Sequence, residues 1–343
     1  DTLAGGLSNT IAGRVCNYCD FNGGGYTVDG ACSSSLLAII TAAKNLVAHD
    51  VDIMLAGGVD ISIDTFELIG FAKTGALTDK EMKVYDRDSS GFIPGEGCGF
   101  IVLKRLADAK KDKDKIYAVI DGWGISSDGK GGMTKPSVTG QSNAIINAYK
   151  KANYPITDID FIEGHGTGTV VGDKVELSAI ANSFRYFSNM QPKSCGITSL
   201  KSVIGHTKAA AGIGAFIKTV IALNQRIIPP TAGITRMHPI FDENNMSIYP
   251  VLSAQQKPQN SILKAGVSAM GFGGINSHIV LSSADKPLAH LQPQLPIEVL
   301  DASHQNSEIF IFSEKTQDDL TSSIKKIRQA AQGISIGELA DLA

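Results

Sequence analysis

Short apolar blocks alternate with helix-like patterns along this chain, and the first complete unit surrounds a cysteine. Residues 26–28 are aromatic or β-branched and favour a strand, whereas apolar side chains recur at helical spacing over residues 36–47. The small residues 29–35 lie between the two patterns and contain Cys32. The sequence therefore predicts a strand, a sharp turn and a helix, with Cys32 at the N-terminus of the helix.

The same alternation continues through the rest of the chain. Further strands are predicted at residues 52–58, 99–103, 116–120, 158–163, 196–200, 264–268 and 277–281. Helices are predicted at residues 137–152, from 173 onwards and at 209–224, with a short helical or turn-like stretch at 7–15. Loops are predicted at residues 73–97 and 122–132, which are polar or rich in glycine. Strands that alternate with helices in this way are typical of a layered α/β fold.

Changes in composition divide the chain into three parts. Residues 110–115 form a run of mixed charge, which predicts a solvated connector between residues 1–114 and 115–284. Residues 285–343 are expected to form an α/β linker that leads to another module. Its predicted features are prolines at Pro287, Pro293 and Pro296, a strand at 308–312, a helix at 317–332 and a capping box at Ser335 and Glu338.

Composition excludes several classes of protein. The chain has 343 residues, a hydrophobic fraction of 43% and a formal net charge of −3. These values indicate a globular protein without the basic face that nucleic acids require. No apolar run approaches the roughly 20 residues of a membrane span, so we expect no membrane partner and a cytoplasmic location. The five cysteines are expected to be reduced, and the lone C-x-x-C of Cys16 and Cys19 lacks the second pair that would indicate a metal site.

Cys32 is the first candidate for chemistry. Unpaired backbone N–H groups and the positive end of the helix dipole would stabilise a thiolate at the predicted helix N-terminus, so we expect a lowered pKa for Cys32. Gly30 and Ala31 leave room for a substrate carbonyl to approach these donors. The alternative is a buried apolar cysteine without reactivity.

Two histidines follow predicted strands in glycine-flanked loops, His165 in residues 163–169 and His206 in residues 201–207. A cysteine with two such histidines predicts thiolate chemistry on a carbonyl, with the imidazoles as hydrogen-bond donors or acid–base groups. Each histidine could instead be structural. Residues 164–168 could also form a phosphate-binding dinucleotide loop, although their glycine spacing does not fit G-x-G-x-x-G.

Three charged residues near the histidines have simple structural alternatives. Asp173 and Glu176 stand in a D-x-x-E pattern before an apolar run, which is the pattern of a helix cap. Lys201 precedes His206 by five positions and could be a solvated loop lysine. Their spacing alone leaves both interpretations open.

Four segments together resemble the ketosynthase domains of polyketide and fatty-acid synthases, the β-ketoacyl synthase branch of the thiolase fold. They are residues 28–35, 163–169, 201–206 and 271–274, which occur in the order of the family. The resemblance covers most of residues 1–283. It implies a duplicated five-layered αβαβα core, in which the family's first half begins upstream of Asp1.

The resemblance also implies roles for single residues. Cys32 would accept the acyl group, while His165 and His206 would assist decarboxylation and hold the malonyl thioester carbonyl. Lys201 would be the family's motif lysine, paired with Asp173 or Glu176.

Further roles concern the substrate arm and the oxyanion. Thr167 and Thr169 match threonines that hydrogen-bond the pantetheine arm, and Gly273 belongs to the same binding loop as Phe272. Phe272 matches a gating phenylalanine whose backbone N–H would join that of Cys32 in an oxyanion hole.

A finer similarity concerns residues 8–17, 23–30, 71–77 and 205–212. These segments are similar to iterative synthases that make the polyene precursors of enediynes. Lys208 contributes to this similarity, because many modular synthases carry Glu or Gln at that position.

The expected function is decarboxylative Claisen condensation of a malonyl unit on an acyl carrier protein with a cysteine-bound acyl chain. The substrates would arrive on phosphopantetheine, and the domain itself would bind no cofactor or metal. An acyltransferase domain would follow in the same polypeptide, and the enzyme would be a homodimer. The rival functions are a thiolase, a catalytically silent dimerisation fragment and a dinucleotide-binding protein. A thiolase normally brings a second cysteine in its C-terminal glycine loop, and residues 271–276 contain none.

Overall fold

The computed structural model describes residues 2–130, 133–152, 154–187, 193–243, 246–284 and 316–330. Contacts along the chain separate two compact units, Asp1–Pro287 and Leu288–Ala343. In the second unit the described element is α11 (Gln317–Ala330), which agrees with the predicted helix. The linker prolines, the predicted strand at 308–312 and the capping box at Ser335 and Glu338 lie outside the described residues.

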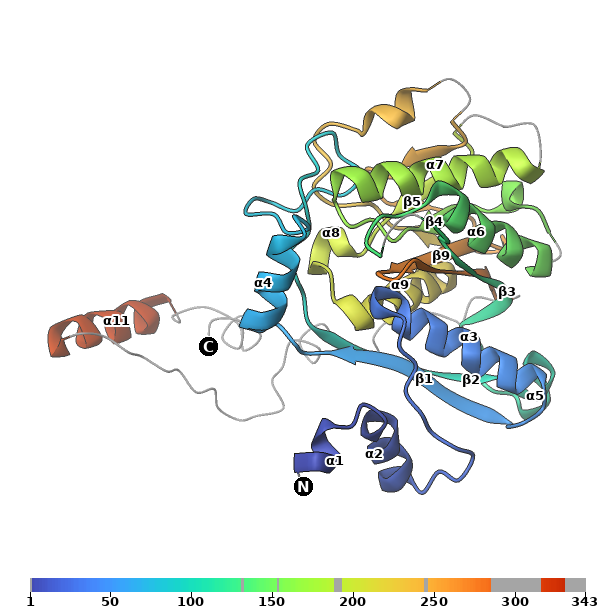
Figure 1. Cartoon of the computed structure of the whole chain (residues 1–343), viewed down its shortest axis with the longest axis horizontal. Helices are drawn as coiled ribbons and strands as arrows, with labels where there is room; N and C mark the ends of the chain where they lie inside the picture. The colour runs from blue at the N-terminus through green and yellow to red at the C-terminus, as the bar shows by residue number, and fades with distance from the viewer. Residues whose placement is uncertain are drawn as a thin grey trace. The chain divides into compact units, whose positions relative to one another are not determined.

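A six-stranded sheet forms the centre of the first unit (Figure 1). Its strands in spatial order are β3 (Ala118–Ser127), β10 (Ile275–Ser283), β9 (Lys264–Gly271), β4 (Phe161–Glu163), β5 (Cys195–Thr198) and β7 (Ile248–Pro250). β3, β10 and β9 are antiparallel, whereas β9, β4, β5 and β7 are parallel neighbours. Parallel β4 and β5 therefore deliver the loops that follow them to the same edge of the sheet.

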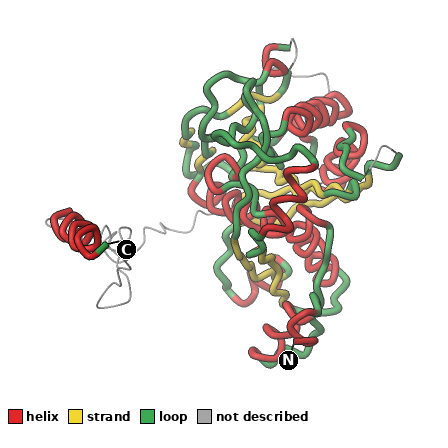
Figure 2. The backbone as a smooth tube through the Cα atoms, turned by 60° about the vertical axis from the view of Figure 1, so that its left-hand side comes forward, coloured by secondary structure: helices red, strands yellow, loops and turns green. Residues whose placement is uncertain are grey.

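Helices cover both faces of this sheet (Figure 2). α6 (Val138–Ala152) and α7 (Val170–Phe187) pack on one face, while α3 (Ser34–Val47) and α9 (Ala211–Gln225) pack on the other. Successive strand residues alternate between the two faces: Phe161 and Ile162 are both fully buried, but they belong to different hydrophobic clusters. β4 is thus apolar on both faces, which is the pattern of a strand enclosed by helices.

A second sheet lies on the far side of α3 and α9. It consists of β1 (Ile53–Asp60) and β2 (Gly97–Lys104), which pair antiparallel. Residues 52–58 were predicted to be a buried strand, but the outer face of this pair is partly exposed. Its large exposed side chains are Ile53, Leu55, Phe100 and Val102. The described residues thus build four of the five expected layers, and no described helix covers the outer face of β1 and β2.

The two central helices begin in the same unusual way, which is the structural trace of a duplication. α3 follows the 3₁₀ turn η1 (Ala31–Ser33), and α9 follows the 3₁₀ turn η3 (Lys208–Ala210). The first residue of each turn, Ala31 and Lys208, has a left-handed backbone with φ of 49° and 48°. The local geometry around Cys32 therefore recurs two residues after His206.

The remaining elements connect these layers. They are α1 (Thr2–Gly6), α2 (Thr10–Cys19), α4 (Thr65–Lys73), α5 (Leu106–Asp112), α8 (Lys201–Ile204), the 3₁₀ turns η2 (Ile156–Asp158) and η4 (Pro239–Asp242), and the short pair β6 (Ile227–Ile228) and β8 (Gln255–Gln256). None of the helices in the described ranges is long and apolar enough to cross a lipid bilayer.

Two predicted elements differ from the structure. Residues 26–28 are not a strand, since no neighbouring chain pairs with them in the described part of the molecule. The glycine-rich loop predicted at 122–132 is largely strand, because β3 runs on to Ser127. A side chain at Gly124 would lie 1.9 Å from the carbonyl oxygen of Ala144, so this glycine allows α6 to pack directly on the strand.

Candidate active site

A cavity of about 430 Å³ brings the predicted residues together at the edge of the central sheet. Its lining includes Cys32, His165, His206 and Phe272, which come from four separate parts of the chain. A second cavity of about 530 Å³ lies between β2 and α9, but it is almost entirely apolar and neither histidine lines it. We therefore assign the chemistry to the cavity that contains Cys32.

Cys32 lies in the tight turn η1, at the start of α3, as predicted. The turn is fixed from behind: the hydroxyl of Ser33 donates to the carbonyl oxygen of Ala269 at 3.1 Å and lies 2.5 Å from the Ser277 hydroxyl. The expected lowering of the Cys32 pKa is wrong. Desolvation raises the pKa to about 11, and the attraction of the Lys201 ammonium only partly offsets it.

Both histidines are held by a backbone N–H on Nδ1. Met270 donates its N–H to Nδ1 of His165 at 3.3 Å, and Lys208 donates its N–H to Nδ1 of His206 at 3.1 Å. A nitrogen that accepts a hydrogen bond carries no proton, so in the neutral ring the proton is on Nε2. Burial lowers the pKa of both rings well below the ordinary range, and the nearby Lys201 charge lowers it further. Each ring is thus a neutral Nε2–H donor.

Lys201 is a buried residue, not a solvated loop lysine. The residue is 4% exposed, and Nζ donates to the carbonyl oxygen of His165 at 2.5 Å. Burial lowers the pKa of the ammonium, and Glu176 is the carboxylate that opposes this shift most strongly, ahead of Glu163 and Asp173. Lys201 therefore supports the His165 loop, and Glu176 is its main electrostatic partner.

Asp173 and Glu176 clamp the loop in front of α7. Glu176 accepts the N–H groups of His165 and Gly166 at 2.6 and 2.8 Å. Asp173 accepts the N–H of Gly168 at 3.0 Å. Both side chains are buried, so they do more than cap an exposed helix end. Because these loop N–H groups are already bonded, they are not free to cradle a phosphate, and the dinucleotide-loop interpretation fails.

The two threonines of this loop line the cavity. The hydroxyl of Thr169 accepts the Gly172 N–H at 3.2 Å and so caps α7, while the Thr167 hydroxyl lies 3.0 Å from it. Thr169 is thereby fixed by the helix, and Thr167 is fixed by Thr169.

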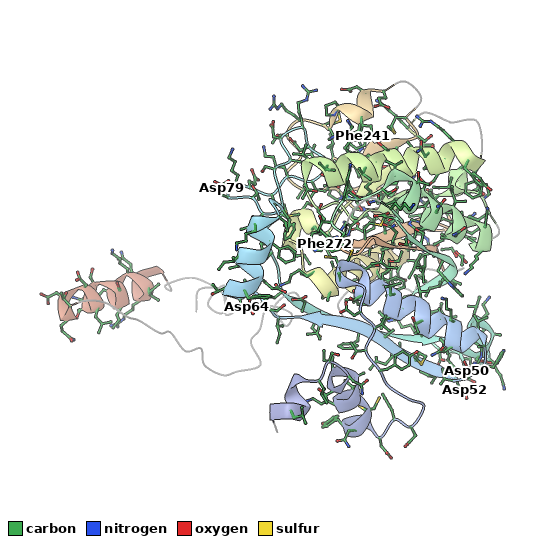
Figure 3. The ribbon with its side chains drawn as sticks, viewed as in Figure 1. Asp50, Asp52, Asp64, Asp79, Phe241 and Phe272 are labelled. Carbon is green, nitrogen blue, oxygen red and sulfur yellow. The ribbon has the colours of Figure 1, made fainter. Side chains whose placement is uncertain are left out.

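The loop between β9 and β10 closes the cavity against the Cys32 turn. A side chain at Gly271 would lie 2.2 Å from the carbonyl oxygen of Gly30, so the two backbones touch there. Phe272 is 42% exposed and lies between α4 and the central sheet (Figure 3). Among the described residues, neither the Cys32 N–H nor the Phe272 N–H donates to a backbone carbonyl oxygen. Gly273 does not line the cavity, and its N–H donates to Met133 at 2.8 Å.

Sequence reasoning missed three residues that shape the site. Tyr85 is fully buried and donates its hydroxyl to Glu176 at 3.0 Å and its N–H to Asp173 at 2.7 Å. The ring of Phe92 packs edge-on against His206, with centroids 4.9 Å apart, and Phe71 of α4 packs on Phe92 at 5.2 Å. Tyr85 and Phe92 lie in residues 73–97, whose polar composition concealed these buried aromatic rings.

The cysteines and acidic residues give no sign of a metal site. All five cysteines are free. In the part of the chain that the structure describes, no group of three or more His, Cys, Asp or Glu side chains is arranged as metal ligands would be.

Comparison with known proteins identifies the family. The family described as beta-ketoacyl synthase, N-terminal domain, matches residues 2–109, and the beta-ketoacyl synthase C-terminal domain matches residues 117–235. One component of the phenolphthiocerol/phthiocerol polyketide synthase of Mycobacterium tuberculosis is 38% identical over 275 residues, which cover 79% of this chain and 15% of that protein. One component of the polyunsaturated fatty acid synthase of Thraustochytrium is 38% identical over 295 residues, which cover 83% of this chain and 10% of that protein. The chain thus spans only a small part of the length of these relatives.

Solved structures agree with this assignment. The ketosynthase from module 6 of the bacillaene synthase of Bacillus subtilis matches with a TM-score of 0.79 and 30% identity, covering 98% of this chain and 58% of that chain. The ketosynthase from module 1 of the bacillaene synthase of Bacillus amyloliquefaciens matches with a TM-score of 0.76 and 30% identity, covering 81% and 51%. The chain thus has the thiolase-like fold of ketosynthases, and it belongs to the β-ketoacyl synthase family, with type I polyketide synthases among its relatives.

Proposed function

We propose that this chain catalyses decarboxylative Claisen condensation between a cysteine-bound acyl chain and a malonyl thioester. One observation carries the proposal: Cys32 shares a cavity with two neutral histidines whose Nε2–H groups are available as donors. Two neutral donors can bind the thioester carbonyl oxygen of a malonyl group and stabilise the enolate that forms as carbon dioxide leaves.

Acyl transfer to Cys32 is the first step. The sulfur attacks the incoming thioester carbonyl, the N–H groups of Cys32 and Phe272, which donate to no backbone carbonyl oxygen in the described residues, receive the developing oxyanion, and the carrier thiol leaves. Because the pKa of Cys32 is about 11, the resting sulfur is a thiol. Its proton therefore passes to the sulfur of the departing carrier, which leaves as a thiol.

Condensation is the second step. The malonyl carboxylate leaves as carbon dioxide, and the resulting carbanion attacks the acyl carbonyl on Cys32. A new carbon–carbon bond forms, the bond to the Cys32 sulfur breaks, and the released thiolate takes a proton from solvent. His165 and His206 act as hydrogen-bond donors throughout, because burial keeps their pKa values well below the ordinary range.

The neighbouring residues position these groups. Lys201, Glu176 and Asp173 hold the loop that carries His165. Thr167 and Thr169, which line the cavity, bind the pantetheine arm in this proposal. Phe272 gates the cavity, with Gly273 in the same loop.

The wider setting follows from the family and is part of the proposal. The substrates arrive on the phosphopantetheine of an acyl carrier protein, and the domain itself holds no cofactor. The enzyme works as a cytoplasmic homodimer, with residues 1–114 and 115–284 as its two halves. Residues 285–343 lead to an acyltransferase domain, and the product is a polyene of the enediyne type.

The test supplies the chain with an acyl pantetheine thioester and a malonyl pantetheine thioester and detects products by mass spectrometry. We expect a β-ketoacyl thioester and release of carbon dioxide, with the β-ketoacyl product absent from the Cys32→Ser variant. A thiolase would instead form the product from two acyl thioesters without malonate. A dinucleotide-binding protein would respond to titration with NAD or NADP.

A further inference from the structure

Lys208 combines three features that no role assigned so far requires. Its side chain is 5% exposed, and Nζ forms ion pairs with Asp60 at 3.0 Å and Glu67 at 2.7 Å. Its backbone is left-handed, with φ of 48°. Its N–H is the donor that holds Nδ1 of His206 at 3.1 Å.

The left-handed backbone is a cost that something else must offset. A lysine has a Cβ, so it disfavours positive φ, where glycine or asparagine is usual. Rotation about φ turns the Lys208 side chain relative to its own N–H, so this conformation lets the N–H point at His206 while Nζ reaches the two carboxylates. The ion pairs of the side chain add to the backbone bond of the 3₁₀ turn, in which the Ala210 N–H donates to the Thr207 carbonyl oxygen at 2.9 Å, in stabilising the conformation.

The two carboxylates are themselves held in place. Asp60 accepts the Ser62 hydroxyl at 2.7 Å and the Ala209 N–H at 3.1 Å. The Ser62 hydroxyl oxygen also lies 2.9 Å from a carboxylate oxygen of Glu67, so that it can donate to either carboxylate. Glu67 lies in the first turn of α4, which Asp64 caps by accepting the Glu67 N–H at 2.8 Å. The cation of Lys208 is therefore anchored to the end of β1 and to the start of α4 together.

The backbone donor to His165 is held in a different way from Lys208, the donor to His206. The donor to His165 is the N–H of Met270, a strand residue whose position is fixed by the β9–β10 ladder opposite Asn276. Lys208 lies in a 3₁₀ turn outside any ladder. A side-chain anchor supplies there the rigidity that a sheet supplies for His165.

We propose that Lys208 is a positioning residue for His206. Its backbone N–H holds the imidazole as the Nε2–H tautomer, and the ion pairs of its side chain with Asp60 and Glu67 keep this N–H in place. The effect on the reaction rests on the proposed role of His206 in condensation. The link between the ion pairs and the tautomer of His206 can be tested independently of that role.

The experiment compares the wild-type chain with Lys208→Met and with the double variant Lys208→Met, Glu67→Met. The single variant leaves two carboxylates without their cation, and it can therefore fail to fold. The double variant removes one charge of each sign, while Asp60 keeps its bonds to Ser62 and Ala209. The matched control is Lys104→Met, which removes a lysine paired with Asp112 and Asp114 away from the cavity.

Two readouts are measured on each variant. Two-bond ¹H–¹⁵N correlation spectra of ¹⁵N-histidine-labelled protein report the tautomer of His206, assigned by loss of its signals in His206→Gln. Release of carbon dioxide from a malonyl thioester reports the reaction. In the folded double variant we expect a mixture of His206 tautomers and a rate lower by about 10- to 100-fold. Lys104→Met should leave both readouts unchanged.

A wild-type His206 spectrum in the double variant would overturn the proposal, whether or not the rate falls. A changed spectrum with an unchanged rate would support the positioning by Lys208 and contradict the catalytic role of His206 instead. If neither Met variant folds, Glu67→Gln tests the same link between the ion pair and the His206 tautomer. It is a milder change, because it removes a single charge from a side chain that is 27% exposed. An unaltered His206 spectrum in a folded Glu67→Gln variant would also count against the proposal.

Discussion

The rings of His165 and His206 lie with centroids 5.4 Å apart and planes at 84°, although 41 positions of sequence separate them. Each is anchored through Nδ1 by a backbone N–H. Two imidazoles fixed at this distance can bind one small group between them. This arrangement suits the binding of a thioester carbonyl better than the transfer of a proton from one ring to the other.

Replacing either histidine should separate the two half-reactions. In His165→Ala or His206→Ala, condensation and malonyl decarboxylation should fall by about 100-fold or more, because a donor to the enolate oxygen is lost. Acylation of Cys32 by an acyl thioester should continue at a measurable rate, since the N–H groups of Cys32 and Phe272 are untouched. Mass spectrometry of the intact protein measures acylation, with His49→Asn as the surface control. Loss of acylation in both folded variants would contradict these roles.

Alkylation of Cys32 should depend steeply on pH. With the pKa raised to about 11, the thiolate fraction should rise about tenfold per pH unit from about pH 7 to about pH 9, without reaching a plateau. Peptide mapping after brief exposure to iodoacetamide gives the rate at Cys32 alone. A rate that levels off near neutral pH would show that the helix N-terminus and Lys201 outweigh desolvation.

The contact between Gly271 and Gly30 should be essential. In Gly271→Ala the new methyl group would meet the Gly30 carbonyl oxygen at 2.2 Å, and the loop bearing Phe272 would have to move away from Cys32. We expect acylation and condensation to fall together. The control is Gly70→Ala, where α4 leaves nothing within 4 Å of the new methyl group, and which should stabilise the chain by about 0.5–1 kcal/mol. Unchanged activity in Gly271→Ala would mean that this contact does not assemble the site.

Glu176 should stabilise the His165 loop more than the hydroxyl of Tyr85 does. Glu176→Gln replaces one acceptor oxygen by an NH₂ group, so a buried loop N–H loses its acceptor, at a cost of about 1–3 kcal/mol of unfolding free energy. Tyr85→Phe removes a single hydrogen bond and should cost about 1 kcal/mol. Urea unfolding gives both values. Equal losses in the two variants would contradict the role of Glu176 as the main support of the loop.

Asp173 should make stability depend on pH. Desolvation raises its pKa to about 7, whereas an unfolded chain has an ordinary value of about 3.9. The native state therefore holds this proton more tightly than the unfolded state does. Its stabilising contribution is complete below about pH 4 and disappears as the pH rises through about 7, with a total on the order of 4 kcal/mol. Asp173→Asn lacks this dependence, so urea unfolding of both proteins isolates it. A wild-type advantage that grows with pH would have the wrong sign.

Elements with strong local periodicity were predictable. The helices α6 and α9 and the strands β9 and β10 lie where apolar spacing predicted them, because each buries one stripe or face whose pattern is local. The helix α4 was missed, and it has no buried residue to give it a clear apolar stripe. The strand at 26–28 was predicted wrongly because β-propensity says nothing about whether a neighbouring strand is available.

The motifs in this sequence also identified the family and some of the residues that line the cavity, among them Cys32, His165 and His206. Cys32, His165 and His206 could be singled out because each is a reactive side chain among small residues at the end of a strand or the start of a helix. This combination can be recognised in consecutive residues without knowledge of the fold.

Electrostatics, by contrast, depended on the tertiary structure. The sequence predicted a lowered pKa for Cys32 from the helix N-terminus, but burial by distant segments reverses the shift. Lys201 resembles a loop lysine in the sequence, but the fold buries it under the His165 loop. Lys208 pairs with Asp60 and Glu67, which lie more than 140 positions away in the sequence. A sequence determines which groups can ionise and how they are spaced, whereas desolvation and tautomer depend on neighbours that only the folded chain brings within hydrogen-bond distance.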